Sequence, residues 1–521
     1  MAEPLRYLAS DAVVVGYDFS TGGVKALAFD LTGHTLAAVR FPTDLWTEDG
    51  VSELNLLQLE GQARAATRAI AAALADIGRL NDWAVVGVSA THHTAGRIDA
   101  HHNPIRRAIC WNDQTLAAFH AEGLARLGGQ ERCRELIGGP WAVRYTLSHL
   151  VKDAHLSAGA TDTLLPRADW ERTRLILPHG PLAAGYLTGC WGVTSVSSAA
   201  STGLMDLRSN EWRTEMLEAI AQPDLRELAR RCLPRIIAAE TPIGPLADHV
   251  ALDAGLPAGV RPTVYPTLDD QAAGLIGGGA VDAGHVAIIL GNSAVVNSSS
   301  ARLPRTDGLD AMKLNWGPYL WMRCYSNGAQ FLDRQVGAHL SPEQWERLTA
   351  AAAAIPPRCH GVSVSPFLFA EPSLGVTSPR LAWSPAEPHD AGVRLRACFE
   401  AIAYLIALGV EAHERAGQTI TRLTVSGGIA KNDLMVTILA SVLGRPLERL
   451  VSDEGSALGA AVAAVAGAEA QGRRSRGIVE PYTAADAVSQ MVRFRDRVEP
   501  RPDWVEAYRH GLRDFEGRLS G

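Results

Sequence analysis

Hydrophobic residues along the chain alternate between two periodicities, one typical of helices and one typical of buried strands. Residues 56–78 form a long, alanine-rich helical pattern, and residues 393–417 form a second one. Each is followed by a short apolar run, at 83–90 and at 420–428, that ends in a loop of small residues. This alternation predicts an α/β fold.

Two β-hairpin patterns with similar turns occur far apart, one opening each half of the chain. Residues 13–29 contain two β-runs joined by Ser-Thr-Gly-Gly, and residues 285–300 contain two joined by Gly-Asn-Ser. The repetition predicts two domains of one architecture that face each other, although chance similarity between hairpins is common. The proline-rich stretch 256–270 is the predicted crossover between the halves.

Composition places the chain among ordinary soluble proteins. Its 521 residues suggest about three ordinary domains or two large ones, and 47% of them are hydrophobic. A net charge of −7 argues against a large nucleic-acid surface. We find no apolar run long enough for a membrane span and no signal-peptide pattern. The seven cysteines lack CxxC spacing and are interpreted as reduced thiols of a cytoplasmic protein.

The first hairpin carries a pattern suited to phosphate. The turn of residues 20–23 lets backbone N–H groups and hydroxyls approach an anion, and Lys25 adds a compact positive charge. Asp18 would repel phosphate, so its presence favours a Mg²⁺ ion between them. The alternative is a plain surface hairpin with a solvated aspartate.

The segment 16–37 resembles the first phosphate motif of the FGGY carbohydrate kinases, in the actin/hexokinase/Hsp70 superfamily. Further segments resemble motifs of that family in the same order: 87–115, 185–212, 267–296, 424–447 and 453–467. The resemblance implies two ribonuclease H-like (actin-like ATPase) domains facing across a cleft. It implies a sugar substrate with ATP and Mg²⁺, and a homodimer only by the habit of the family.

The same resemblance divides the chain. Residues 1–262 would form a sugar-binding domain with the first phosphate turn, and 263–480 a domain with the second phosphate turn and the adenosine site. Residues 481–521 would be helices that pack back on the body.

The resemblance also implies the ATP site, with Asp18 as the residue that holds the metal. The predicted ATP contacts are Ser20, Thr21, Gly22, Gly23, Lys25, Gly291, Asn292, Ser293, Gly328, Gly427, Gly428 and Asn432. Seen alone, the Ser-Gly-Gly run at 426–428 would be a simple strand-to-helix turn.

For the acceptor, the family pattern implies that Asp270 is the general base and that Gln271 contacts the sugar. Asp269 competes on the residues alone, and helix N-capping is the alternative for this acidic pair. The predicted sugar contacts are His92, His93, Trp111, Asn112, Asp113, Asp270 and Gln271. Adjacent histidines on a strand point opposite ways, so at most one of the two is expected in the site. Asp113 is the residue expected to grip a diol.

Several departures from the family pattern make the substrate the open question. Ser20 replaces a glycine, Asn292 stands where threonine is usual, and residues 371–383 only loosely match the family fingerprint. We expect ATP-dependent phosphorylation of a ketopentose such as xylulose. The alternatives are a glycerol- or erythritol-type polyol, another ketose, or a nucleotide- or sugar-binding protein with impaired turnover. A nicotinamide dehydrogenase is disfavoured because the first turn is not G-x-G-x-x-G.

Overall fold

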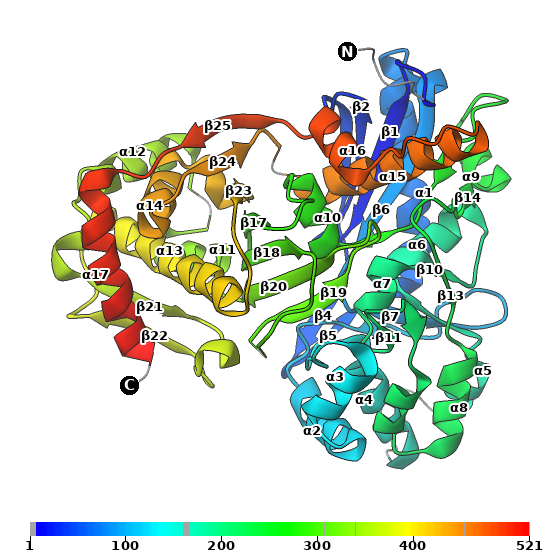
Figure 1. The fold of residues 1–521 in the computed structure, drawn as a ribbon, viewed down its shortest axis with the longest axis horizontal. Helices are drawn as coiled ribbons and strands as arrows, with labels where there is room; N and C mark the ends of the chain where they lie inside the picture. Colours follow the sequence, from blue (N-terminus) through cyan, green and yellow to red (C-terminus); the bar gives the residue numbers. More distant parts are fainter. Residues whose placement is uncertain (1–6, 160–166, 307, 339, 453, 520–521) are drawn as a thin grey trace.

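Two twisted sheets, one in each half of the chain, organise the molecule into two lobes (Figure 1). The structure is a computed structural model that describes residues 7–159, 167–306, 308–338, 340–452 and 454–519. Within these residues, no helix combines the length and the apolar character needed to cross a bilayer. The seven cysteines are free thiols, and five of them are buried.

The first sheet has the order β14-β15-β6-β1-β2-β3, and β16 also pairs with β6. Its strands are β1 (Val13–Phe19), β2 (Val24–Asp30), β3 (Thr35–Phe41), β6 (Trp83–Ala90), β14 (Gly244–Pro245), β15 (Thr263–Val264) and β16 (Leu268–Asp269). Every residue of β1 is buried, because its alternate side chains enter two different cores. Val13 and Val15 pack in the core that contains α1 (Leu59–Asp76), and Val14 packs in the opposite core.

The second sheet has the order β19-β20-β18-β17-β23-β24-β25. Its strands are β17 (His285–Leu290), β18 (Ala294–Ser300), β19 (Asp310–Lys313), β20 (Tyr319–Tyr325), β23 (Arg422–Ser426), β24 (Leu447–Leu450) and β25 (Phe494–Val498). The long helix α13 (Ala391–Arg415) covers one face of this sheet with a continuous apolar side.

The two sheets repeat one topology. In the first, β1 is antiparallel to β2 and parallel to β6, and β6 is parallel to β15. In the second, β17 is antiparallel to β18 and parallel to β23, and β23 is parallel to β24. The predicted duplication of hairpins is therefore confirmed, together with the two-domain α/β architecture.

Two helices join the lobes through very close packing. Helices α10 (Asp270–Gly277) and α15 (Gly455–Ser475) lie against each other beside the first sheet. A Cβ atom on Gly277 would lie 2.0 Å from the carbonyl oxygen of Gly455. One on Gly459 would lie 1.9 Å from the carbonyl oxygen of Ala273. Only glycine permits this backbone approach, which fixes how the lobes meet.

Smaller elements extend both lobes. The first lobe adds β4 (Leu45–Glu48), β5 (Val51–Leu54), β7 (Ala95–Ile98), β8 (Ala108–Ile109), α2 (Leu116–Leu127), α3 (Gln130–Ile137), α4 (Thr146–Gly159), α5 (Arg167–Arg172), β9 (Leu175–Pro178), α6 (His179–Thr188), β10 (Val193–Ser195), α7 (Val196–Ala200), β11 (Met205–Asp206), β12 (Glu211–Trp212), α8 (Pro223–Arg231), β13 (Arg235–Ile237) and α9 (Asp248–Asp253). The second adds α11 (Ala329–Val336), α12 (Pro342–Ala353), β21 (Ser363–Phe367), β22 (Arg380–Ser384) and α14 (Asp433–Leu443).

The last residues contain α16 (Ala484–Met491), β25 and α17 (Pro502–Leu519). The strand β25, which the sequence pattern did not predict, pairs with β24 and returns the chain to the second lobe. Helix α17 then packs against α13 and α14. The domain boundaries at 262 and 480 stay predictions; the first sheet itself includes β15 and β16, which follow residue 262.

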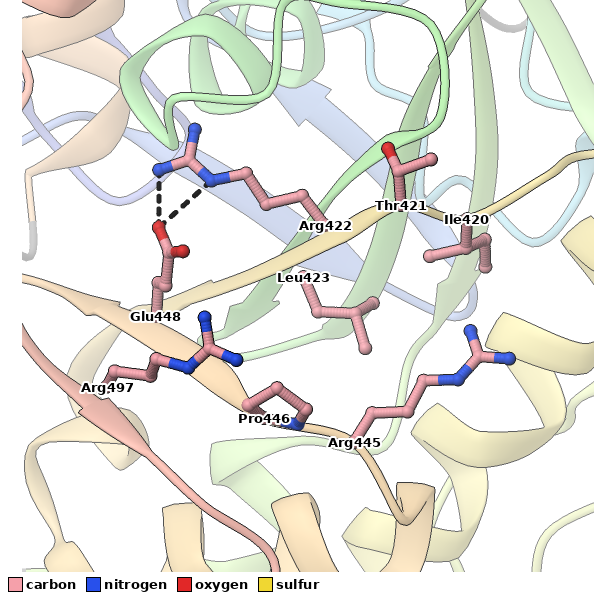
Figure 2. A pocket seen from close by; sticks show the side chains of 8 residues that line it. All are labelled: Ile420, Thr421, Arg422, Leu423, Arg445, Pro446, Glu448 and Arg497. Carbon is pink, nitrogen blue, oxygen red and sulfur yellow. Dashed lines mark hydrogen bonds and ion pairs between the residues drawn. The ribbon is translucent and has the colours of Figure 1, made fainter.

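A pocket of about 130 Å³ opens beside β23 and β24 (Figure 2). Three arginines line it, and each has an acidic partner. Arg422 pairs with Glu448, Arg445 with Glu414 and Arg497 with Glu499. With its cations neutralised in this way, the pocket is an ion-pair cluster of the second lobe.

Candidate active site

Three parallel strand ends place acidic residues at one edge of the first sheet. In the register, Asp18 of β1 lies beside Ser89 of β6, and Ser89 lies beside Leu268 of β16. Asp269 and Asp270 follow at once, where β16 ends and α10 begins. Carboxyl ends of parallel strands are where α/β proteins gather functional groups. The strand order therefore places Asp18 and the acidic pair at the same edge.

The two adjacent aspartates have different surroundings. Asp269 caps α10, because its Oδ1 accepts from the backbone N–H groups of Gln271 (3.0 Å) and Ala272 (2.9 Å). Its Oδ2 accepts from the Ser197 hydroxyl at 2.5 Å. The capping alternative therefore holds for Asp269.

Asp270, the first residue of α10, keeps a carboxylate oxygen available. Its Oδ1 is buried and has no hydrogen-bond partner in the described part of the chain. Burial raises the pKa of Asp270 well above its usual range, and the charges of Asp269 and Asp18 raise it further. A half-buried carboxylate with a raised pKa and an oxygen that accepts no hydrogen bond is suited to accept a proton.

His92 and His93 point the same way, which corrects the prediction of opposite faces. Strand β6 ends at Ala90, and His93 has a left-handed backbone with φ 63°. Their rings stack at 3.6 Å between centroids, and Tyr145 stacks on His93 at 4.5 Å. Burial lowers the pKa of both histidines, so both are neutral at physiological pH. Neither Nε2 atom has a hydrogen-bond partner among the described residues, and that of His92 lies 3.8 Å from Oδ1 of Asp269.

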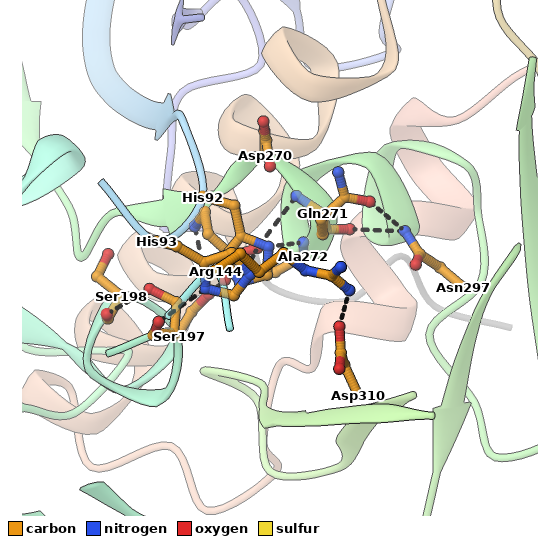
Figure 3. A network of polar contacts seen from close by, with 12 residues as sticks. His92, His93, Arg144, Ser197, Ser198, Asp270, Gln271, Ala272, Asn297 and Asp310 are labelled. Carbon is orange, nitrogen blue, oxygen red and sulfur yellow. Dashed lines mark hydrogen bonds and ion pairs between the residues drawn. The ribbon is translucent and has the colours of Figure 1, made fainter. Parts of the chain in front are cut away.

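Figure 3 shows Arg144 beside the two histidines, below Asp270. Arg144 lies in the segment between α3 and α4 of the first lobe, and it forms an ion pair with Asp310 of β19 in the second. Gln271 is also held across the lobes, because Asn297 of β18 donates to its Oε1 at 3.0 Å. Both contacts depend on how the lobes meet.

Asp113 is committed to the interior of the first lobe. Its Oδ2 accepts from Lys152 Nζ at 2.7 Å, and this pair is almost wholly excluded from solvent. Its Oδ1 accepts from the backbone N–H (2.8 Å) and the hydroxyl (2.5 Å) of Thr115. With both oxygens satisfied, the expectation that Asp113 grips a diol does not fit this geometry.

Trp111 and Asn112 precede Asp113 in the turn after β8, and both are half-buried. The side chain of Asn112 accepts from the Ser52 hydroxyl at 2.8 Å. Their predicted sugar contacts stay predictions.

The first phosphate turn is tight. The hydroxyl and N–H of Ser20 both bond the Gly23 carbonyl, at 2.8 and 3.0 Å. Thr21 is half-buried and Gly22 is exposed with no atom near its Cβ position, so this side of the turn is open. Ser20, which stands where the family has a glycine, therefore closes the turn with a hydrogen bond from its own hydroxyl.

Asp18 suits a divalent cation. Ser89 Oγ, at 3.2 Å, is its one hydrogen-bond donor in the described structure. Burial raises the pKa of Asp18 to about 6, although nearby Lys25 opposes this. A bound cation would place a positive charge beside this carboxylate and favour its charged form, so Mg²⁺ fits the site.

Lys25 is paired with a residue that the motifs did not single out. Its Nζ lies 2.5 Å from Oε2 of Glu454, the residue before α15, and Arg40 pairs with the other oxygen at 2.5 Å. Asp453, the first residue of the predicted closing helix, lies outside the described residues. Glu454 lies inside that predicted segment, and in the structure it is the residue directly before α15.

The second phosphate turn is built against another loop. Gly291 N–H donates to the Ser293 carbonyl at 3.0 Å, and Gly328 N–H donates to the Asn292 carbonyl at 3.1 Å. A Cβ on Gly328 would lie 2.5 Å from the Gly291 carbonyl oxygen. Gly328 is thus in direct contact with this turn.

A missed acidic residue supports the loop of Gly328. Glu371 is buried and accepts from the Ser326 N–H (2.5 Å) and from Asn327 Nδ2 (2.8 Å). Burial raises its pKa to about 7. It lies in the stretch that only loosely matches the family fingerprint.

The predicted adenosine residues divide into three environments. Gly427 has φ 96° and packs on Leu290, whose carbonyl oxygen would lie 2.4 Å from a Cβ. Gly428 faces open space, which leaves backbone accessible to a ligand. Asn432 caps α14 through Met435 N–H (3.1 Å) and donates to Thr349 Oγ1 (2.8 Å). Its side chain is therefore already engaged.

Comparisons with known proteins find similar proteins over both lobes. Residues 13–277 match the N-terminal domain of the FGGY family of carbohydrate kinases, and residues 287–468 match its C-terminal domain. The glycerol kinase of Geobacter sp. (strain M21) is 28% identical over 87% of this chain and 90% of its own length. The xylulose kinase of Escherichia coli (strain K12) is 26% identical over 86% of this chain and 88% of its own length.

The xylulose kinase structure from Rhodospirillum rubrum superposes with a TM-score of 0.80 at 21% identity, covering 98% of both chains. It shares the fold, with two lobes of the actin-like ATPase type. Because the two domain matches together span most of the sequence, the chain belongs to the FGGY family of carbohydrate kinases.

Proposed function

We propose that this protein transfers the γ-phosphoryl group of ATP to a hydroxyl of a ketopentose such as xylulose. The observation that carries the proposal is the buried Oδ1 atom of Asp270, which has no hydrogen-bond partner among the described residues and lies at the strand edge that Asp270 shares with Asp18. The stacked His92 and His93 support a polyhydroxylated acceptor, because their Nε2 atoms, which form no hydrogen bond among the described residues, lie in the same site. The xylulose kinases among its relatives support the choice of sugar.

In this proposal Asp270 accepts the proton of the attacking hydroxyl. Lys25 and the turns at 20–23 and 291–293 would face the phosphates, and Gly428 would lie against the adenosine. Asp18 would hold Mg²⁺, which when bound neutralises charge on the transferring phosphoryl group. The two lobes would hold donor and acceptor in line and limit the access of water. Arg144 and Asn297, which contact the opposite lobe, would help to keep that arrangement.

A glycerol- or erythritol-type polyol is the second candidate. The residue that favours this candidate is Gln271, which directly follows Asp270. Its side-chain oxygen accepts a hydrogen bond from Asn297. Glycerol kinases stand beside xylulose kinases among the similar proteins.

The test is ADP release with Mg·ATP across xylulose, ribulose, fructose, glycerol and erythritol, with Asp270→Ala as the control. We expect xylulose to stimulate release by the unaltered protein and not by the variant. Stimulation by glycerol or erythritol instead would select the second candidate. If ATP binds but no acceptor stimulates release, the chain is a binding protein with impaired turnover.

The pH dependence of acceptor phosphorylation provides a further prediction. The pKa of Asp270 is raised by burial and by Asp269, so the acid limb of kcat/KM should lie above the ordinary range of an aspartate. Activity should fall as pH drops through this raised pKa, because protonated Asp270 cannot accept a proton. Asp269→Asn removes one of the repelling charges and should move the limb to lower pH. A limb that does not move would contradict the assignment of this titration to Asp270.

A further inference from the structure

A cavity of about 570 Å³ lies apart from the residues discussed above, beside α15. Its walls come from five places in the chain, with residues 239–240, Pro266, 281–283, 315–318 and 463–485 contributing. The size is within the range of small-molecule sites. No residue of the predicted ATP or acceptor site lines it.

The cavity lies where the chain passes between the lobes. Residues 281–283 are part of the connection from α10 to β17, which leads from one lobe to the other. Residues 239–240 and Pro266 belong to loops of the first lobe, and 315–318 form the turn between β19 and β20 of the second. Figure 1 shows α15 and α16 at this junction. A ligand in the cavity would therefore contact both lobes and the segment that joins them.

The walls favour a compact apolar ring. Ala463, Ala466, Gly467 and Ala470 form one face of α15, and small side chains there leave room for a flat group. Trp316 and Tyr482 add aromatic surface. The indole N–H of Trp316 is buried and has no acceptor in the described part of the chain.

The charges favour a cation. Glu240 and Asp282 are both lining residues, and no lysine, arginine or histidine is among them. Glu240 is paired with Arg474 at 2.8 Å, whereas Asp282 is exposed and forms no ion pair within the described residues. Acidic and aromatic groups together recognise ammonium ions and disfavour phosphorylated ligands.

Hydrogen bonds connect the wall to the acidic pair. Asn315 donates from Nδ2 to the Thr267 carbonyl at 3.1 Å and accepts at Oδ1 from Ser197 N–H at 2.8 Å. Ser197 in turn donates from its hydroxyl to Asp269, which caps the helix that starts at Asp270. A shift of Asn315 would therefore displace Ser197 and Asp269, and with them the start of α10.

We propose that this cavity is a regulatory site for a small organic amine. Its ring would lie against the alanine face of α15 and Trp316, and its ammonium group would lie beside Asp282. Because both lobes line the cavity, the amine would bind the open and closed arrangements with different affinities. Its effect on turnover rests on the proposed function, whereas its binding and its coupling to nucleotide do not.

Tryptamine is the probe, titrated into the full chain by calorimetry. We expect saturable binding at one site, and an affinity that changes by about fivefold or more when Mg²⁺ and a non-hydrolysable ATP analogue are present. Tryptophol, which carries a hydroxyl in place of the ammonium group, should bind about threefold more weakly or worse. Asp282→Asn should weaken tryptamine binding by a similar factor.

Ala466→Phe fills the cavity and is the decisive variant. It should abolish tryptamine binding while leaving nucleotide binding and the thermal unfolding midpoint close to those of the unaltered protein. If that variant does not fold, Ala463→Leu places the block one helical turn earlier. Binding that persists in the blocked variant, or no saturable binding to the unaltered chain, would overturn the site. Binding that ignores the nucleotide would overturn the regulatory role.

These readouts separate the inference from the proposed function. Failure of every acceptor to stimulate ADP release would overturn the kinase proposal and leave the calorimetric coupling unchanged.

Discussion

Asp270→Asn should lower kcat for acceptor phosphorylation by about 10²- to 10⁴-fold, the usual contribution of a positioned general base. Asparagine keeps the shape of the side chain and removes the proton acceptor, so Mg·ATP affinity should change little. Initial rates of ADP release at saturating acceptor, together with nucleotide binding by calorimetry, measure both quantities. The variant should also unfold at a higher temperature at neutral pH. The folded state disfavours the charged Asp270 carboxylate, and the substitution removes that cost.

Asp269→Asn is the matched control for this prediction. Asparagine is also a good N-cap, so α10 should keep its start, and Ser197 can accept from the new amide. We therefore expect its kcat to stay within about tenfold of the unaltered value. Near-complete loss in Asp269→Asn with retained turnover in Asp270→Asn would exchange the two roles.

Most strands and helices could be predicted from the sequence, because burial on two faces leaves a strong hydrophobic pattern. Residues 83–90, predicted as a strand, are β6, and 393–417 overlap almost the whole of α13. The hairpins predicted at 13–29 and 285–300 are β1–β2 and β17–β18. Strand β25 could not be predicted, because three consecutive charged residues at 495–497 leave only Phe494 and Val498 as apolar positions.

The directions of side chains at the site were harder to predict from the sequence than the positions of the residues that carry them. The prediction that His92 and His93 diverge assumed that the strand continues through them. In the structure the chain has left β6, and the left-handed backbone of His93 brings the rings together. A left-handed conformation of a residue other than glycine depends on its surroundings. No local sequence pattern predicts this conformation at His93.

Partners distant in the sequence were the main omission. Glu454 lies 429 residues from Lys25, and Asp310 lies 166 residues from Arg144. Such pairs follow from how the lobes pack, which cannot be inferred from local patterns in a single sequence. They matter to the proposed function because Lys25, the cation assigned to phosphate, is paired with the Glu454 carboxylate.

Lys152→Met should destabilise the first lobe by about 3–5 kcal/mol, the usual cost of leaving one member of a buried ion pair alone. Lys152 Nζ and Asp113 lie 2.7 Å apart, with side chains 3% and 0% exposed. Methionine fills a similar volume but removes the positive charge, so the Asp113 carboxylate keeps only its neutral donors from Ser52 and Thr115. The midpoint and slope of urea unfolding measure the loss.

The double variant Lys152→Met/Asp113→Asn tests the cause and the role of Asp113 together. Removing both charges should recover much of the lost stability, because no uncompensated carboxylate remains. Asp113→Asn alone should reduce stability more clearly than it raises the KM for the acceptor, since both oxygens of Asp113 are used inside the lobe. A large rise in KM with unchanged stability would instead restore Asp113 as a sugar contact. It would mean that its bond to Lys152 opens when the acceptor binds.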